Sequence, residues 1–111
     1  MRATATEAQG VLTVHVTGEL DALSANELRP GLDRLLEEAR ERLVVDISGL
    51  RLLDSSGVGI LVYLFRKLRA SGRAFAVRGA SEQPLAILRL MKLDQIFFDD
   101  DGPKVWRAAD M

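Results

Sequence analysis

The sequence predicts an α/β fold with a mixed, mostly parallel sheet of four to five strands and three to four helices. Strand-like apolar segments alternate with helix-like amphipathic segments along most of the chain, which is typical of parallel strands joined by right-handed crossovers. Only Gln9 and Gly10 separate the first two strand-like segments, at residues 2–8 and 11–17. This spacing indicates a hairpin, so we expect one antiparallel edge.

Length and composition narrow the functional classes. The 111 residues suffice for one domain, and we expect residues 1–111 to form it. A net charge of -1 argues against a dedicated nucleic-acid-binding protein, because contacts to backbone phosphates need a basic surface. No cysteine is present, which excludes a disulfide and a cysteine-ligated metal, and the single histidine cannot build a multi-histidine site. We expect no metal site and no cofactor. No apolar run approaches the roughly 18 residues of a membrane span, and we expect a cytoplasmic domain without direct membrane insertion.

The segment at residues 11–17 alternates between apolar and polar residues, as a half-buried strand does. Leu12, Val14 and Val16 are expected to face the core, and His15 the polar side. His15 is the only histidine and has no companion base nearby in the sequence. We therefore expect a surface strand residue rather than a catalytic one.

The first helix is expected to follow this strand. Ser24 and Glu27 have the spacing of a capping box, and apolar residues then recur at helical intervals to about residue 40. Pro30 lies inside this pattern, where proline removes a hydrogen bond or kinks the helix.

A buried strand is expected at residues 43–47, ending at Ser48 and Gly49. The helix after it, at residues 56–71, is apolar at nearly every position, becomes basic near its C-terminal end and stops at Gly72. The helix has more apolar surface than one face needs. Part of it either docks a partner or is buried between the sheet and a neighbouring helix.

The C-terminal third continues the alternation. A strand at residues 73–78 should turn Phe75 and Val77 inward, and Ser81 should cap a helix with Pro84 in its first turn. The apolar side of that helix is expected to comprise Leu85, Leu88, Leu90, Met91 and Leu93. The last predicted features are a short strand or hydrophobic plug at 96–98, an acidic loop at 99–101 and a helical turn with Val105 and Trp106.

The hexapeptide at residues 54–59, Asp-Ser-Ser-Gly-Val-Gly, lies where the central strand gives way to the apolar helix. Ser55 and Ser56 can accept hydrogen bonds from free N–H groups of the first turn, and the positive end of the helix dipole favours an anion there. Each serine is thus either a cap or a hydroxyl that carries a phosphate. Gly57 and Gly59 remove side chains where another molecule could approach closely.

Two loops are expected to meet in space. Functional loops of open α/β sheets gather beyond the carboxyl ends of parallel strands. The loop at residues 21–24 follows one strand and the loop at residues 54–56 follows another, so we expect them to be neighbours.

Three motifs together resemble the STAS domain, specifically the bacterial anti-sigma-factor antagonists. They are the turn at residues 18–21, the strand at residues 44–48 and the hexapeptide, and the resemblance covers nearly the whole chain. It implies a small α/β domain that binds an anti-sigma factor with serine kinase activity and so releases a sigma factor.

The resemblance also implies a switch. The kinase phosphorylates the second serine of the Asp-Ser-Ser-Gly turn, which is Ser56 here, and a serine phosphatase reverses the modification. Asp54, Ser55 and Gly57 form the surroundings of that serine, and Asp21 matches the family's acidic residue in the other loop. The expected partner-binding residues are Asp21, Ser24, Asp54, Ser55, Ser56, Gly59 and Ile60.

Other functional classes have weaker support. The sequence has no Gly-x-Ser-x-Gly elbow, and residues 57–59 are too short for a nucleotide-binding loop, so we expect no catalysis. The alternative is a STAS module of a stress-signalling scaffold or of a lipid or anion transport complex. The intact serine pair favours the phosphoswitch, because a transport accessory domain needs no phosphoacceptor.

Overall fold

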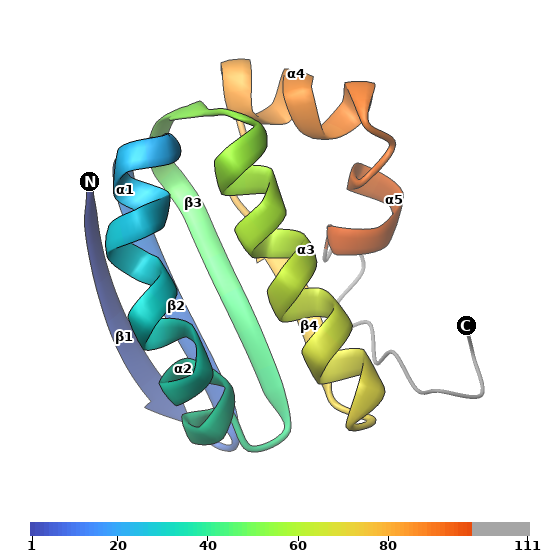
Figure 1. Ribbon diagram of the computed structural model, residues 1–111. Helices are drawn as coiled ribbons and strands as arrows, with labels where there is room; N and C mark the ends of the chain where they lie inside the picture. Colours follow the sequence, from blue (N-terminus) through green and yellow to red (C-terminus); the bar gives the residue numbers. More distant parts are fainter. Residues whose placement is uncertain (99–111) are drawn as a thin grey trace.

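The computed structural model describes residues 1–98. They contain one sheet with the strand order β1-β2-β3-β4 (Figure 1). β1 (Arg2–Ala8) is antiparallel to β2 (Val11–Leu20). β2 is parallel to β3 (Arg42–Leu53), which is parallel to β4 (Ala74–Arg78). The predicted fold class, with one antiparallel edge on a mostly parallel sheet, is confirmed.

The helices are distributed around this sheet. α1, α2 and α3 lie along one face, and α4 and α5 lie on the side of β4 (Figure 1). Pro30 interrupts the first predicted helix as expected, because a 3₁₀ turn at Arg29–Gly31 separates α1 from α2. The helices are α1 (Ala22–Leu28), α2 (Leu32–Glu38), α3 (Ser55–Ala70), α4 (Glu82–Leu90) and α5 (Asp94–Phe97).

The hydrophobic core lies between the sheet and α1–α3. The predicted inward residues of β2 are buried, as are Phe75 and Val77 of β4. Phe97 is fully buried, and its ring centroid lies 5.7 Å from that of Phe65 and 5.3 Å from that of Phe75. The segment near residue 97 is therefore a hydrophobic plug, as one alternative predicted, but it forms a helical turn rather than a strand. Within residues 96–98, Phe98 alone forms a bridge to β4, opposite Val77.

The predicted apolar side of α4 is partly wrong. Leu88 is fully buried, whereas Leu90 is 82% exposed and Met91 is 48% exposed. Leu90 follows the buried Leu88 by two residues and so points away from the buried face, and α4 ends before Met91. The acidic loop at 99–101 and the helical turn with Val105 and Trp106 lie outside the described residues.

β3 is longer than the sequence suggested. It does not end at Ser48 and Gly49 but continues to Leu53, and its register against β2 shifts on either side of Thr17 and Gly18. Gly49 lies opposite Thr17, and a Cβ at Gly49 would stand 2.7 Å from the Thr17 Cγ2 atom. Glycine is needed here for a close approach between strands, so it does not mark a turn.

No helix among residues 1–98 is long and apolar enough to cross a membrane.

Candidate functional site

The ends of β2 and β3 bring the two predicted loops together. Their last residues, Leu20 and Leu53, are paired, and the Asp54 N–H donates to the Leu20 carbonyl at 3.2 Å. Both residues are fully buried, so the loops that follow them start from a fixed base. The prediction that residues 21–24 and 54–56 are neighbours is confirmed.

Asp54 is the N-cap of α3. Its Oδ1 atom accepts hydrogen bonds from the Ser56 N–H at 2.9 Å and from the Gly57 N–H at 3.1 Å. The prediction that a serine can cap this helix is therefore wrong. Asp54, one residue before Ser55, occupies the N-cap position with extended backbone. Its carboxylate bonds the N–H groups that a serine cap would otherwise bond.

The two serines are consequently left without a capping role. Ser55 is exposed and Ser56 is half-buried. Within residues 1–98, the Ser56 hydroxyl makes no hydrogen bond to another group. An unbonded hydroxyl thus stands on the first turn of a 16-residue helix, at the positive end of its dipole.

The two glycines of the hexapeptide differ in what surrounds them. A Cβ at Gly57 would stand 2.6 Å from the Leu53 Cδ1 atom and 2.7 Å from the Leu20 carbonyl oxygen. Gly57 therefore lets α3 pack on the sheet, and the prediction that it opens space for another molecule is wrong. Gly59 is exposed, and a Cβ there would meet no atom within 4 Å. Of the two glycines, only Gly59 leaves room for a partner.

The loop after β2 is built around Asp21. Asp21, rather than Ser24, caps α1, so the predicted Ser24–Glu27 box is wrong and the helix begins earlier. The Ser24 N–H donates to Asp21 Oδ1 at 3.0 Å, and the Ser24 hydroxyl accepts from the Asp21 N–H at 3.0 Å. Hydrogen bonds from the Ser24 N–H and then from its hydroxyl hold the pKa of Asp21 below its ordinary value.

Two of the predicted partner-binding residues are buried in the fold. Ser24 is only 5% exposed, and its hydroxyl is tied to the Glu19 carbonyl at 2.9 Å. Ile60 is 3% exposed because it faces the sheet from the second turn of α3. Most of the apolar surplus of α3 is buried in the same way, which favours the burial alternative over docking.

Sequence reasoning missed two residues at this end of the molecule. Leu23, on the first turn of α1, is 72% exposed. Gln83 of α4 makes two hydrogen bonds with the backbone of Leu53. Leu23 could have been found as an apolar residue two positions after Asp21, in the loop that the resemblance had already marked. No local sequence pattern marks Gln83.

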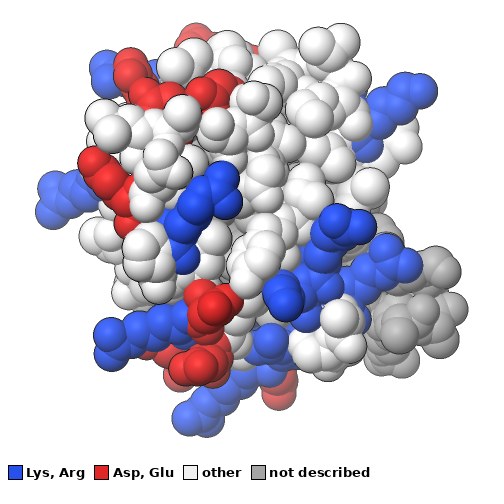
Figure 2. All heavy atoms as spheres, viewed as in Figure 1, with Lys and Arg blue, Asp and Glu red and all other residues white. Residues whose placement is uncertain are grey.

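Charge is distributed unevenly along α3. Figure 2 shows a broad uncharged surface over the middle of the molecule and basic side chains gathered below it. The last turn of α3 contains Lys67 and Arg69, whereas its first turn contains no acidic residue. The two ends of the helix are roughly 24 Å apart, so these cations do not bond to the serine turn.

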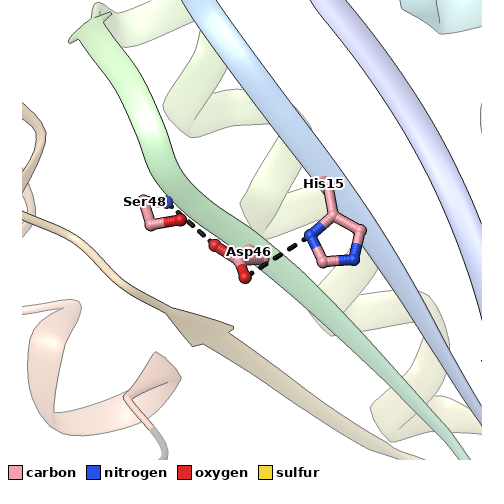
Figure 3. Close-up of polar contacts among 3 residues, drawn as sticks. All are labelled: His15, Asp46 and Ser48. Atoms are coloured by element: carbon pink, nitrogen blue, oxygen red, sulfur yellow. Dashed lines mark hydrogen bonds and ion pairs between the residues drawn. The ribbon is translucent and has the colours of Figure 1, made fainter.

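His15 belongs to a separate cluster on the sheet face opposite α1–α3 (Figure 3). Its Nδ1 atom lies 3.4 Å from Asp46 Oδ2, and the Ser48 N–H donates to Asp46 Oδ1 at 2.9 Å. Burial raises the pKa of Asp46, but the hydrogen bonds from Ser48 and the charges of His15 and Arg78 outweigh this and lower it. Ser48 contacts the carboxylate and not the imidazole, so this cluster lacks the contact between nucleophile and base that serine catalysis needs.

Comparisons with known proteins agree with this geometry. The family model of the STAS domain matches residues 2–108. The chain is 30% identical over 70 residues to the anti-sigma F factor antagonist of Paenibacillus polymyxa, covering 62% of this chain and 60% of that relative, which is less than two thirds of its length. It is 27% identical over 85 residues to the anti-sigma-B factor antagonist of Bacillus subtilis, covering 77% of each.

A solved structure extends the likeness to three dimensions. The crystal structure of an anti-sigma factor antagonist from Mycobacterium paratuberculosis superposes with a TM-score of 0.71 at 28% identity, covering 86% of this chain and 81% of that one. The chain therefore belongs to the STAS domain family.

Proposed function

We propose that this chain is an anti-sigma-factor antagonist. It binds an anti-sigma factor with serine kinase activity, releases the sigma factor that the kinase held, and is switched off by phosphorylation of Ser56. The names of its relatives support the first part. The observation that carries the switch is the Ser56 hydroxyl beside the Asp54 cap, which makes no hydrogen bond to any residue that the structure describes.

The first turn of α3 can accept a phosphate without unfolding. Phosphorylation adds about -1.5 to -2 charges and three acceptor oxygens. The helix dipole stabilises an anion there by only roughly 0.3 to 1 kcal/mol, which is small beside the stability of a domain. Because Asp54 rather than Ser56 caps the helix, modification of Ser56 breaks no hydrogen bond of the fold.

The same phosphate is costly inside an interface. Beside Asp54, and across the paired strand ends from Asp21, it meets like charge and loses hydration when a partner closes over it. Several kcal/mol of such cost suffice for a switch, since a roughly 10⁴-fold change in affinity needs about 5.5 kcal/mol. The phosphate thus blocks the interface directly rather than by refolding the domain.

The proposed partner surface is the end of the molecule where the two loops meet. It comprises the accessible residues of the predicted set, with Leu23 added as an exposed apolar contact. A serine phosphatase that restores binding acts at the same turn. The surface residues are Asp21, Leu23, Asp54, Ser55, Ser56 and Gly59.

In this proposal the chain works in the cytoplasm as a binding protein and not as an enzyme. Histidine cannot serve as a base for Ser56, because the only histidine of the sequence pairs with Asp46 on another face of the sheet.

A pull-down from lysate of the source organism tests the proposal. Wild type, Ser56→Asp and the control Ser71→Asp serve as baits, with bound proteins identified by mass spectrometry. Ser71 is an exposed serine at the C-terminal end of α3, outside the proposed partner surface. We expect wild type and Ser71→Asp to retain a serine kinase of the anti-sigma type and Ser56→Asp to lose it. Equal retention by all three would contradict the switch, and transport ATPases as the retained partners would favour the alternative of a transport module.

A further inference from the structure

The edge of β3 changes neighbour along its length. β4 pairs with β3 only as far as Arg78, which lies opposite Asp46, whereas β3 continues to Leu53. Beyond that point β2 still pairs with one edge of β3, and β4 no longer covers the other. The backbone of Leu53, which is fully buried, therefore needs a different partner on that edge.

The side chain of Gln83 is that partner. Its Oε1 atom accepts from the Leu53 N–H at 2.8 Å, and its Nε2 atom donates to the Leu53 carbonyl at 2.8 Å. The carboxamide thus makes the paired hydrogen bonds that a neighbouring strand would make. Leu53 is followed directly by Asp54, so Gln83 holds the residue from which the α3 cap extends.

The backbone around Gln83 is itself constrained. Glu82 has a φ of 51°, a left-handed conformation that is strained for a residue other than glycine, asparagine or aspartate. Pro84, on the other side, is buried. Strain of this kind persists only where surrounding contacts hold the backbone. The two hydrogen bonds that the neighbouring Gln83 makes with Leu53 are such contacts.

We propose that Gln83 is a positioning residue for Ser56. It acts through Leu53 and Asp54, whose carboxylate bonds the Ser56 and Gly57 N–H groups and so sets where the acceptor hydroxyl points. The consequence for phosphorylation rests on the proposed function of Ser56. The two hydrogen bonds between Gln83 and Leu53, which we call the brace, are a property of the fold.

Amide hydrogen exchange tests the brace without a kinase. In Gln83→Leu we expect the Ser56 and Gly57 amides to exchange about tenfold faster, the effect of losing roughly one net hydrogen bond from the support of the cap. Amides of the β2–β3 pairing should change less. Gln95→Leu is the matched control, since Gln95 is also an exposed glutamine and its side chain makes no hydrogen bond among residues 1–98. An equal change at all amides would overturn the proposal.

Gln83→Glu supplies a rescue that a merely structural role would not show. At pH 7 its carboxylate repels the Leu53 carbonyl, and exchange at Ser56 should match that of Gln83→Leu. Near pH 4 a protonated carboxyl has one donor and one acceptor, as the amide does, and exchange should return toward the wild-type rate measured at that pH. Absence of recovery would contradict the geometry of the brace.

The kinase retained by wild type supplies the last readout. We expect Gln83→Leu to lower kcat for phosphorylation about tenfold with KM within about twofold, because the substitution mispositions the acceptor turn and leaves the rest of the binding surface, at Asp21, Leu23 and Gly59, in place. An unchanged kcat would overturn the link to Ser56. If no kinase is retained, the proposed function fails, and the exchange experiment still decides whether Gln83 braces the turn.

Discussion

α1 and α3 begin in almost the same way, each with an aspartate as N-cap, but the serine in the first turn has a bonded hydroxyl in α1 and an unbonded one, within residues 1–98, in α3. Asp21 caps α1 with φ -114° and ψ -171°, and Asp54 caps α3 with φ -108° and ψ -175°. Each carboxylate accepts a backbone N–H from the first turn. The Ser24 hydroxyl of α1 is buried and bonded, whereas the Ser56 hydroxyl of α3 is not bonded within the described residues.

The difference arises from position rather than from sequence motif. Ser24 is the third residue of α1, so its side chain turns back to the cap and also reaches the Glu19 carbonyl. Ser56 is the second residue of α3, and the corresponding third position is occupied by Gly57, which packs on Leu53. A serine near a helix start is therefore available for chemistry only when the cap does not use its hydroxyl.

The largest expected effect concerns the glycines that seat α3. Gly57→Ala places a methyl group against Leu53 and the Leu20 backbone and should destabilise the domain by about 1–3 kcal/mol. Gly59→Ala meets open space within the fold and should stabilise it by about 0.5–1 kcal/mol, since alanine favours the helix. Urea denaturation of both variants measures the contrast, and equal stabilities would contradict the packing role of Gly57.

The next effect compares the two serines directly. Ser24→Ala removes a buried hydroxyl from the Asp21 cap and leaves the Glu19 carbonyl without its partner, so we expect a loss of about 1–3 kcal/mol. Ser56→Ala should change the free energy of unfolding by less than about 0.5 kcal/mol. Thermal unfolding followed by circular dichroism separates these outcomes. A large loss for Ser56→Ala would mean that its hydroxyl supports the fold.

Removal of the α3 cap should have a smaller effect. Asp54→Ala leaves the Ser56 and Gly57 N–H groups without their acceptor and should cost about 1 kcal/mol. Asp54→Asn keeps an oxygen at the cap and should stay within a few tenths of a kcal/mol of wild type. If both variants lost the same stability, the carboxylate would act through charge rather than through capping.

The smallest effect is a dependence of stability on pH. Because the pKa of Asp21 is lower in the folded chain, its ionised form stabilises the fold above the ordinary aspartate pKa of about 3.9. That contribution is lost as the pH falls through the lowered value. Asp21→Asn should therefore lose less stability than wild type in denaturation curves between about pH 5 and pH 2, and identical curves would argue against the bonds to Ser24.

Periodicity was enough to predict most of the architecture. The alternation of β2, the apolar run of α3 and the kink at Pro30 each follow from side-chain chemistry that acts over a few residues. The position of the serine turn at a helix start followed in the same way. Its relation to the other loop followed from parallel strand topology, and its proposed role came from the family resemblance.

Features decided by distant contacts could not be predicted from local pattern. Ser48 and Gly49 resemble a turn, but pairing with Thr17 keeps them in the strand. Ile60 was among the expected partner-binding residues, yet it is only 3% exposed, because the helical phase turns it into the core. Gln83 lies 30 residues from Leu53 in the sequence, and nothing local links them.

Phosphosite mapping tests the central claim most directly. The kinase retained by wild type is incubated with ATP and either wild type, Ser56→Ala, Ser55→Ala or Ser24→Ala, and the phosphorylated residue is identified by mass spectrometry. We predict one phosphate on Ser56 in wild type and in Ser55→Ala, and none in Ser56→Ala. The folded molecules of Ser24→Ala should also carry one phosphate on Ser56. Phosphate on Ser55, or undiminished phosphorylation of Ser56→Ala, would contradict the assignment of Ser56 as the acceptor.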